Sequence, residues 1–324
     1  MSRVLITGAA GQDGTILASQ LTRNGADIAA LIKPGTDTST LRRYVPGVTC
    51  LECDLADPPA LRQAIRDFQP QWIFNLGGFT APGESWKHEE EVRAINVDAV
   101  QVMLEETQAL PDTRFFQASS ASIFEGVDVI PQTEKTPRSP RSPYAVSKAD
   151  AMELVDQARD RGVFATSAIL YNHESPLRGP GFVTRRISMA VARIAAGEQE
   201  YLELGDVEVA RDWGWAPDYT RAMALMIQAQ VPHDYVLATG ISHRLSFFLA
   251  KAFETVGISD WRERVRVDQD RIRGTDTNLL VGDARAAYLE LGWRHTVDFD
   301  SMARLMVQHD VQVLTDPESL WTID

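Results

Sequence analysis

Tyr144 and Lys148 stand four residues apart in the segment SPYAVSKAD. On a helix this spacing places both side chains on one face. An ammonium group beside a phenol stabilises the phenolate and lowers a pKa that normally lies near 10, so the phenol can act as a general base at neutral pH. The pair therefore predicts a site that removes the proton of a carbinol.

Hydroxyl groups gather in a second segment, QASSASIFEG, over residues 117–126. Ser120 ends the apolar run RFFQASS, which is expected to be a strand. Its hydroxyl would hydrogen-bond the carbinol oxygen that Tyr144 deprotonates. The first carboxylate of this segment is Glu125. With a hydride acceptor beside them, Tyr144, Lys148 and Ser120 suffice to oxidise an alcohol, and Lys148 would also hydrogen-bond the ribose of the acceptor.

A glycine-rich loop near the start of the chain would hold that acceptor. In LITGAAGQDGTILA, Gly8, Gly11 and Gly14 follow a short apolar run and open a helical pattern. The first glycine permits a tight turn, the second lets the backbone approach a pyrophosphate, and the third allows close packing of helix and strand. Free N–H groups and the helix dipole attract the anion. The loop, which includes Gln12 and Asp13, therefore predicts a dinucleotide-binding site.

The residue after the second expected strand bears on the choice of dinucleotide. A site for NAD usually has an acidic residue there, on the ribose 2′-hydroxyl, whereas AALIKPGT offers Lys33. NADP is therefore favoured and NAD remains possible. Arg42 and Arg43 would also reach a 2′-phosphate, although a pair of arginines on a helix can equally be a solvated face. Asp54, after the third strand, is placed to contact the adenine.

Short apolar runs alternate with longer amphipathic ones through the first half of the chain. The expected strands cover 3–8, 26–32, 48–55, 72–78, 114–120 and 164–171, and the expected helices cover 14–25, 58–70, 89–110 and 142–162. This alternation predicts an α/β fold with a Rossmann-type, doubly wound parallel sheet. The rhythm breaks near residue 173. We therefore expect a dinucleotide-binding domain over 1–172 and a smaller C-terminal α/β substrate-binding lobe over 173–324, interleaved with the first.

Composition excludes several kinds of partner. The chain has 324 residues and a net charge of −13, which would repel a polyanion, so no nucleic acid is expected. No apolar run is long enough to predict a membrane span, and the beginning MSRVLITGAAG predicts a cytoplasmic protein. Cys50 and Cys53 form a lone CxxC within an expected strand, which indicates two inert thiols and no metal site.

Several motifs together resemble one family. These are ITGAAGQDG, FNLGG, SPYAVSK, YNHESPLRGPGFVTRRI, LGDVEVARDWGWAPDY, RGTDTNLLVGD and LGW. Over nearly its whole length the chain resembles the GDP-mannose 4,6-dehydratase family of extended short-chain dehydrogenases/reductases. The resemblance implies an enzyme that acts on a nucleotide-diphosphate sugar, with a GDP-linked sugar favoured. It also implies a homodimer or homotetramer, for which the helices over 89–110 and 143–160 are candidates.

The resemblance also implies roles for individual residues. The cofactor would contact Leu55, Leu76, Gly77 and His173, in addition to the glycine loop, Lys33, Asp54, Tyr144 and Lys148. Asn172 would hold a phosphate or the sugar, and Arg178 and Arg186 would line the entrance. Leu204 and Gly205 would flank the base, Arg211 and Arg273 would contact the diphosphate, and Asp276 would contact the ribose. Ser85 and Val183 complete the substrate positions. Some of these arginines could instead make ion pairs between lobes or subunits.

The segment SSASIF is where this sequence departs from the family. The family has Thr, a small or acidic residue and then Glu where this chain has Ser120, Ala121 and Ser122. That Glu removes the C5 proton and helps the C6 hydroxyl to leave. A serine hydroxyl cannot replace it as a base, and losing a positioned acid/base costs on the order of a hundred- to ten-thousand-fold. The serines instead resemble those of nucleotide-sugar 4-epimerases.

Three functions follow from this departure. The first is a 4-epimerase or related C4 oxidoreductase, in which Ser120 and Ser122 support oxidation without driving elimination. The alternative is a GDP-mannose 4,6-dehydratase with a relocated base, for which Glu84, Glu125 and His173 are candidates. The third is a cofactor-binding regulator without activity, although the intact pair of Tyr144 and Lys148 argues against it.

Overall fold

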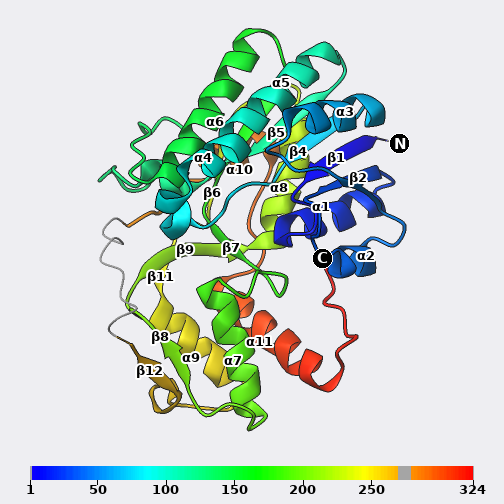
Figure 1. Ribbon diagram of the computed structural model, residues 1–324. Coiled ribbons are helices and arrows are strands. Elements are labelled where there is room, and N and C mark those ends of the chain that lie inside the picture. Colours follow the sequence, from blue (N-terminus) through cyan, green and yellow to red (C-terminus); the bar gives the residue numbers. More distant parts are fainter. Residues whose placement is uncertain (1, 269–278, 324) are drawn as a thin grey trace.

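A parallel sheet of seven strands forms the centre of the molecule (Figure 1). The computed structural model describes residues 2–268 and 279–323. The strands are β1 (Arg3–Thr7), β2 (Asp27–Ile32), β3 (Thr49–Glu52), β4 (Trp72–Asn75), β5 (Arg114–Ala118), β6 (Ala165–Leu170) and β10 (Tyr235–Leu237). Their order is β10-β6-β5-β4-β1-β2-β3, and every neighbouring pair is parallel. The order reverses beside β1, where an open sheet binds ligands. The predicted doubly wound α/β fold is confirmed.

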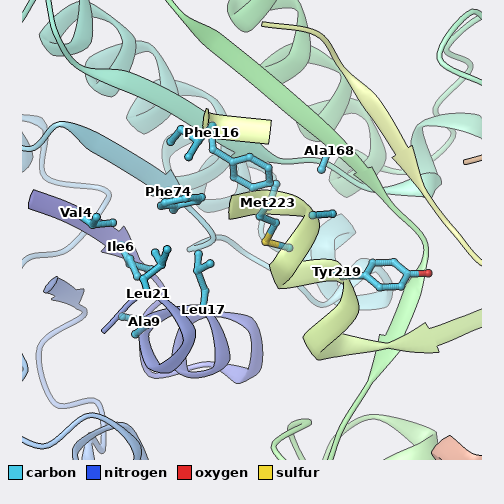
Figure 2. Packing of buried hydrophobic residues seen from close by; sticks show 14 of the residues in the cluster. Val4, Ile6, Ala9, Leu17, Leu21, Phe74, Phe116, Ala168, Tyr219 and Met223 are labelled. Atoms are coloured by element: carbon cyan, nitrogen blue, oxygen red, sulfur yellow. The ribbon is translucent and has the colours of Figure 1, made fainter. Parts of the chain in front are cut away.

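Helices cover both faces of this sheet. One layer contains α3 (Pro58–Phe68), α5 (Ala99–Ala109) and α6 (Pro143–Asp160), and the other contains α1 (Gln12–Arg23) and α8 (Ala216–Gln228), with the short α2 (Ser39–Tyr44) beside α1. Successive strand residues point to opposite layers, so Val4 and Ile6 pack in the α1/α8 cluster while Leu5 packs in the other. Figure 2 shows Val4 and Ile6 with Leu17 and Met223 from these two helices. These two helix layers hold the central sheet, whose carboxyl edge carries the candidate site.

The second lobe has a separate core below the central sheet in Figure 1. Its strands are β7 (Asn172–Glu174), β8 (Leu202–Leu204), β9 (Ala210–Trp215), β11 (Ser242–Arg244) and β12 (Val265–Val267), and its helices are α7 (Val183–Ala195), α9 (Leu245–Thr255) and α11 (Phe299–Thr315). Strands β11, β9 and β7 form one small sheet, and β12 pairs with β8. The core is mainly Trp, Phe, Leu and Met side chains from these elements. Strand β7 directly follows β6, so this lobe begins at the carboxyl end of a strand of the central sheet.

Several segments from the second half of the chain return to the first lobe. Helix α8 packs against α1, and β10 pairs with β6, although both come after residue 173. Helix α10 (Arg285–Leu291) also places Ala287 in the α1/α8 cluster. The division at residue 172 remains a prediction, but these returns mean that neither lobe is a continuous stretch of chain.

The helix expected over 89–110 is interrupted. It consists of α4 (Glu89–Arg93), a π-helical turn at Ala94–Asp98, and α5. Asn96 lies in this π-helical turn and its side chain is buried. Its Oδ1 accepts the Phe79 N–H at 2.8 Å, and its Nδ2 donates to Ser147 Oγ at 3.0 Å. A widened turn of this kind often marks a functional site. The single-helix prediction is therefore wrong in its middle.

The structure also bears on the two cysteines, on metal binding and on membrane-spanning helices. Cys50 and Cys53 are free, and burial raises the pKa of the Cys53 thiol to about 11, so it stays protonated at neutral pH. Within residues 2–268 and 279–323 there is no group of three or more His, Cys, Asp or Glu side chains suited to a metal ion. No helix in the same two ranges is long and apolar enough to cross a lipid bilayer.

Candidate active site

The glycine loop joins β1 to α1 at the carboxyl edge of the central sheet. Gly8 has φ +64°, a conformation that favours glycine, and a Cβ there would lie 2.7 Å from the Gly77 nitrogen. Gly11 precedes α1 and has no side chain to cap the helix, so the first N–H groups of α1 face outward from the loop. These features fit the pyrophosphate of a dinucleotide, because donors are available where a side chain would obstruct approach. Leu76 and Gly77 lie against this turn, and their contact with the cofactor remains a prediction.

Gly14 holds α1 close to the loop. A Cβ at this position would lie 2.4 Å from the Gly8 carbonyl oxygen and 2.5 Å from the Ala9 Cα, which are backbone atoms that cannot rotate away. We expect Gly14→Ala to weaken dinucleotide binding at least tenfold and to lower the melting temperature by about 2–8 °C. Calorimetric titration and a thermal melt would measure both. Gly181→Ala is the control because a Cβ there meets nothing within 4 Å, and unchanged binding by Gly14→Ala would contradict this role.

A buried ion pair ties the glycine loop to β7. The His173 Nε2 lies 2.8 Å from Asp13 Oδ2, while Nδ1 lies 2.7 Å from the Tyr171 carbonyl oxygen. Burial alone would raise the pKa of Asp13, but the His173 charge and hydrogen bond lower it. Burial would lower the pKa of His173, but Asp13 raises it. Gln12 adds a hydrogen bond to the His173 carbonyl oxygen at 3.1 Å, so the loop and the second lobe are held together.

Lys33, Asp54 and Leu55 lie at the carboxyl ends of β2 and β3. The Lys33 Nζ is 4.0 Å from Asp54 Oδ2 and 4.0 Å from Glu91 Oε1, and 61% of its side chain is exposed. Leu55 approaches the loop, since a Cβ on Gly77 would lie 2.9 Å from its Cδ1. Of the two neighbouring arginines, Arg43 donates to the Glu318 carbonyl oxygen and pairs with its carboxylate. The structure therefore places Lys33 near Asp54, whereas Arg43 interacts with Glu318 near the C-terminus.

Tyr144 and Lys148 occupy the first two turns of α6, which Ser142 caps through its Oγ and Pro143 opens. Both side chains are buried. Lys148 Nζ donates to the Ala118 carbonyl oxygen at 3.0 Å and lies 5.9 Å from the Tyr144 ring centre. A Cβ on Gly78 would lie 3.6 Å from this Nζ, so Lys148 stands beside the loop after β4. The glycine turn and the Tyr–Lys pair thus both lie against the loop after β4.

The protonation of the pair follows from its surroundings. Burial raises the pKa of Tyr144, while a hydrogen bond from Ser120 and the charge of Arg178 lower it. Burial also lowers the pKa of Lys148 to about 8. A bound cofactor and substrate would add their own charges here. In the protein alone, burial outweighs the predicted lowering, so the pKa of the Tyr144 phenol lies above its ordinary value and not below it, while the Lys148 ammonium stays mostly protonated at pH 7.

Asn96 belongs to this site but was not predicted from the sequence. Its amide connects the Phe79 backbone, on the loop after β4, with Ser147 on α6. A Cβ on Gly78 would lie 2.8 Å from its Oδ1. The amide therefore fixes α6 against the loop. The available signal was an asparagine between the apolar residues Ile95 and Val97 of an amphipathic pattern.

The serine segment leads from β5 toward α6. Ser120 Oγ accepts the Ser122 N–H at 3.2 Å and caps the short 3₁₀ helix over Ala121–Phe124. Glu125 comes next, and its carboxylate accepts a hydrogen bond from Ser142 Oγ at 3.2 Å and from the Arg141 N–H at 3.3 Å. Its negative charge also raises the pKa of Tyr144. The structure therefore brings a carboxylate to the start of α6, the helix that carries Tyr144 and Lys148.

The expected substrate positions are spread over the second lobe. Asn172 is exposed at the start of β7, and Val183 begins α7. Arg178 is mostly buried, with its Nε 3.3 Å from Glu174 Oε2 and its guanidinium over the Phe182 ring. Arg186 donates to the Glu203 carbonyl oxygen at 3.0 Å, and Arg211 donates to the Ala210 carbonyl oxygen at 2.8 Å.

Two of these positions have buried side chains. Ser85 is fully buried and donates to the Pro82 carbonyl oxygen at 2.6 Å, and Leu204 packs in the core of the second lobe. Gly205 follows Leu204 at the end of β8. Ser85 and Leu204 could therefore influence a ligand only through their backbone or their neighbours. Arg273 and Asp276 lie outside the described residues.

The family model and the relatives in sequence point to one family, and a solved structure shares the fold. The model of the family "GDP-mannose 4,6 dehydratase" matches residues 5–306. A GDP-mannose 4,6-dehydratase of Sinorhizobium fredii is 38% identical, with 96% of this chain and 97% of that protein covered. GDP-mannose 4,6 dehydratase 1 of Arabidopsis thaliana is 35% identical, with 95% and 90% covered. Among solved structures, the UDP-glucose 4-epimerase of Thermus thermophilus with NAD has a TM-score of 0.82 at 25% identity, with 95% and 98% covered.

Proposed function

Because the chain belongs to the GDP-mannose 4,6-dehydratase family of extended short-chain dehydrogenases/reductases, we propose that it oxidises GDP-mannose at C4 and then eliminates water between C5 and C6. The coarser activity is that of an NAD(P)-dependent nucleotide-sugar dehydratase or epimerase. The observation that carries the proposal is the position of buried Tyr144 and Lys148 beside the glycine turn. That position joins an alcohol-oxidising pair to a dinucleotide site.

The residues present account for the first step. Tyr144 takes the proton of the C4 hydroxyl, Ser120 holds the oxygen, and Lys148 stabilises the phenolate by charge. A bound nicotinamide dinucleotide would accept the C4 hydride and later return it. Gly8, Gly11 and the open N–H groups of α1 would hold its pyrophosphate. Arg211 is proposed to contact the diphosphate of the substrate, since a guanidinium group suits phosphate geometry, and Arg178 and Arg186 are proposed to line the entrance.

The second step decides between the two enzymatic functions. Ser122 in place of the family glutamate favours 4-epimerisation, because a 4-ketone without a nearby base would persist until hydride returned to C4. The similarity in fold to a UDP-glucose 4-epimerase is compatible with this second candidate. However, the two relatives described above, at 35% and 38% identity over nearly the whole chain, are both named as dehydratases. This favours dehydration over the epimerisation that the serine segment alone suggested.

Product analysis tests the proposal. Purified protein would be incubated with GDP-mannose and a catalytic amount of NADP, with no added reductant, and followed by proton NMR. Dehydration predicts a new C6 methyl doublet and a product lighter by one water. A changed H4 coupling pattern without a methyl signal would contradict dehydration and establish the epimerase. No change in either signal with GDP-mannose would contradict the proposed substrate.

Cofactor preference is proposed to depend on Lys33. Its ammonium lies at the end of β2 where a ribose 2′-phosphate would be bound, and it already has two carboxylates within 4.0 Å. We expect the protein to bind NADP more tightly than NAD, and Lys33→Ala to weaken NADP binding about tenfold with little effect on NAD. Calorimetric titration with each dinucleotide measures this. Lys251→Ala, on α9 of the second lobe, is the control, and equal losses for both dinucleotides would refute a contact with the 2′-phosphate.

A further inference from the structure

The proposed dehydration needs a group that the usual family position does not supply. Oxidation at C4 makes the C5 proton acidic, because the resulting carbanion is stabilised by the adjacent ketone. Loss of the C6 hydroxyl then requires a base at C5 and a proton for the departing oxygen. Ser122 occupies the position at which the family has glutamate, and a hydroxyl does not serve as such a base. The elimination therefore needs another carboxylate that can reach C5 and C6 of the sugar.

Glu125 is placed at the entrance to the catalytic helix. It follows the 3₁₀ turn that Ser120 caps, and it accepts hydrogen bonds from Ser142 Oγ at 3.2 Å and from the Arg141 N–H at 3.3 Å. Ser142 is two residues before Tyr144 and is the cap of α6. One short segment therefore carries both Ser120 and Glu125 to the start of the helix that holds Tyr144.

Electrostatics agree with this placement. Burial is the main cause that raises the pKa of Tyr144, the Ser120 hydrogen bond and the charge of Arg178 lower it, and the charge of Glu125 raises it by a smaller amount. The carboxylate of Glu125 and the phenol of Tyr144 therefore interact electrostatically. The half-buried Glu125 is also open enough to exchange protons with solvent. In a hexose C4, C5 and C6 are consecutive carbons, so groups that act at C4 and C5 must be neighbours in this way.

The other two candidate bases are committed elsewhere. Both ring nitrogens of His173 have partners, Asp13 and the Tyr171 carbonyl oxygen, within 2.8 Å. Glu84 lies on the exposed 3₁₀ turn over Pro82–Lys87, with Lys87 Nζ 3.0 Å from its Oε2. Its side chain is 55% exposed. Neither arrangement presents a proton acceptor beside Tyr144.

We propose that Glu125 is the general acid/base of the elimination step, taking the role that Ser122 cannot fill. This inference rests on the proposed dehydratase function. The Glu125 carboxylate takes the C5 proton, the C5–H electrons form the C5–C6 double bond, and the C6–O bond breaks. The acid so formed gives its proton to the departing hydroxyl, which leaves as water. The C4 hydride, carried by the nicotinamide, is added at C6, and a proton from solvent is added at C5, which balances the proton removed from O4.

Glu125→Gln separates the chemical role from a structural one. Glutamine retains an oxygen that can accept from Ser142 and Arg141, but it cannot take a proton from C5. In a rapid-mixing experiment with NADP-loaded protein and GDP-mannose, we expect absorbance at 340 nm to rise as in the wild type, because C4 oxidation is intact. We expect formation of the C6 methyl doublet to slow by about a hundred- to ten-thousand-fold. Calorimetric affinity for GDP should stay within threefold of the wild-type value.

The matched control is Glu153→Gln on the exposed side of α6, which should change neither signal. In deuterium oxide the wild-type product should carry one deuterium at C5, and the Glu125→Gln protein should form this species at the same reduced rate as the methyl signal. Methyl formation within tenfold of wild type would overturn the assignment. An equal loss of the 340 nm signal and the methyl signal would also overturn it, because Glu125 would then only position α6. A wild-type protein that forms no methyl signal would instead refute the dehydratase function itself.

Discussion

Tyr144→Phe is expected to lower turnover of the nucleotide sugar by about a thousand- to ten-thousand-fold while leaving dinucleotide binding within threefold of wild type. The phenol is buried, hydrogen-bonded to Ser120 and held beside Lys148, so its oxygen is the group placed to accept the C4 hydroxyl proton. Phenylalanine keeps the ring and removes only that oxygen. Because C4 oxidation precedes both dehydration and epimerisation, the loss is expected whichever product forms.

The measurement is the single-turnover rise at 340 nm together with product NMR. Tyr288→Phe provides a matched control, because Tyr288 lies on α10 and is 41% exposed. Turnover by Tyr144→Phe within tenfold of wild type would refute its role as the base. Loss of dinucleotide binding as well would show that the substitution had disturbed the fold.

Lys148→Met is expected to abolish most activity and, at the same time, to stabilise the protein without its ligands. Methionine fills a similar space but cannot stabilise a phenolate or hydrogen-bond a ribose, so turnover should fall by about a hundredfold or more. The ammonium is buried with one hydrogen bond, to Ala118, and burial lowers its pKa to about 8. The cost of keeping it charged at pH 7 is roughly 3 kcal/mol, since each pKa unit corresponds to about 1.4 kcal/mol. Lys148 is therefore expected to support activity while it lowers the stability of the protein without its ligands.

The same shift sets a pH dependence with a definite sign. The ordinary lysine pKa of 10.5 applies to the unfolded chain, and the folded value is about 8. Between these values the unfolded state binds more protons, so the contribution of Lys148 to the free energy of unfolding increases as pH rises from about 8 to 10.5. Lys148→Met should lack this increase, whereas Lys87→Met, an exposed control, should retain it. Denaturant melts at pH 7 and pH 9.5 measure the difference. A Lys148→Met protein less stable than wild type at pH 7 would contradict the buried-charge account.

Much of this site could be predicted because it depends on local sequence. Near-continuous apolar runs such as RVLIT and FFQA are buried on both faces, which is typical of parallel strands. The glycine spacing in ITGAAGQDG and the four-residue spacing of Tyr144 and Lys148 also describe geometry within one turn or one helix. The structure placed these groups at one edge of the sheet because parallel strands end there together.

Contacts between distant segments could not be predicted in the same way. The Asp13–His173 pair joins residues 160 apart, and α8 and β10 return to the first lobe after residue 173. Asn96 was missed because periodicity alone predicts a continuous helix, and only the buried amide contacts to Phe79 and Ser147 explain the π turn. The serine segment showed that the usual carboxylate is absent. It could not show that Glu125 lies against Ser142 at the start of α6, since that contact depends on how the loop folds back.

In the proposed reaction, hydride leaves C4 of the sugar and returns at C6 after water is lost. The decisive experiment uses GDP-mannose with deuterium at C4, in ordinary water with a catalytic amount of NADP and no added reductant. We expect the deuterium in the C6 methyl group of the product, together with a ketone at C4. Deuterium that remains at C4 in a sugar of inverted configuration would refute dehydration and assign the protein to the epimerases.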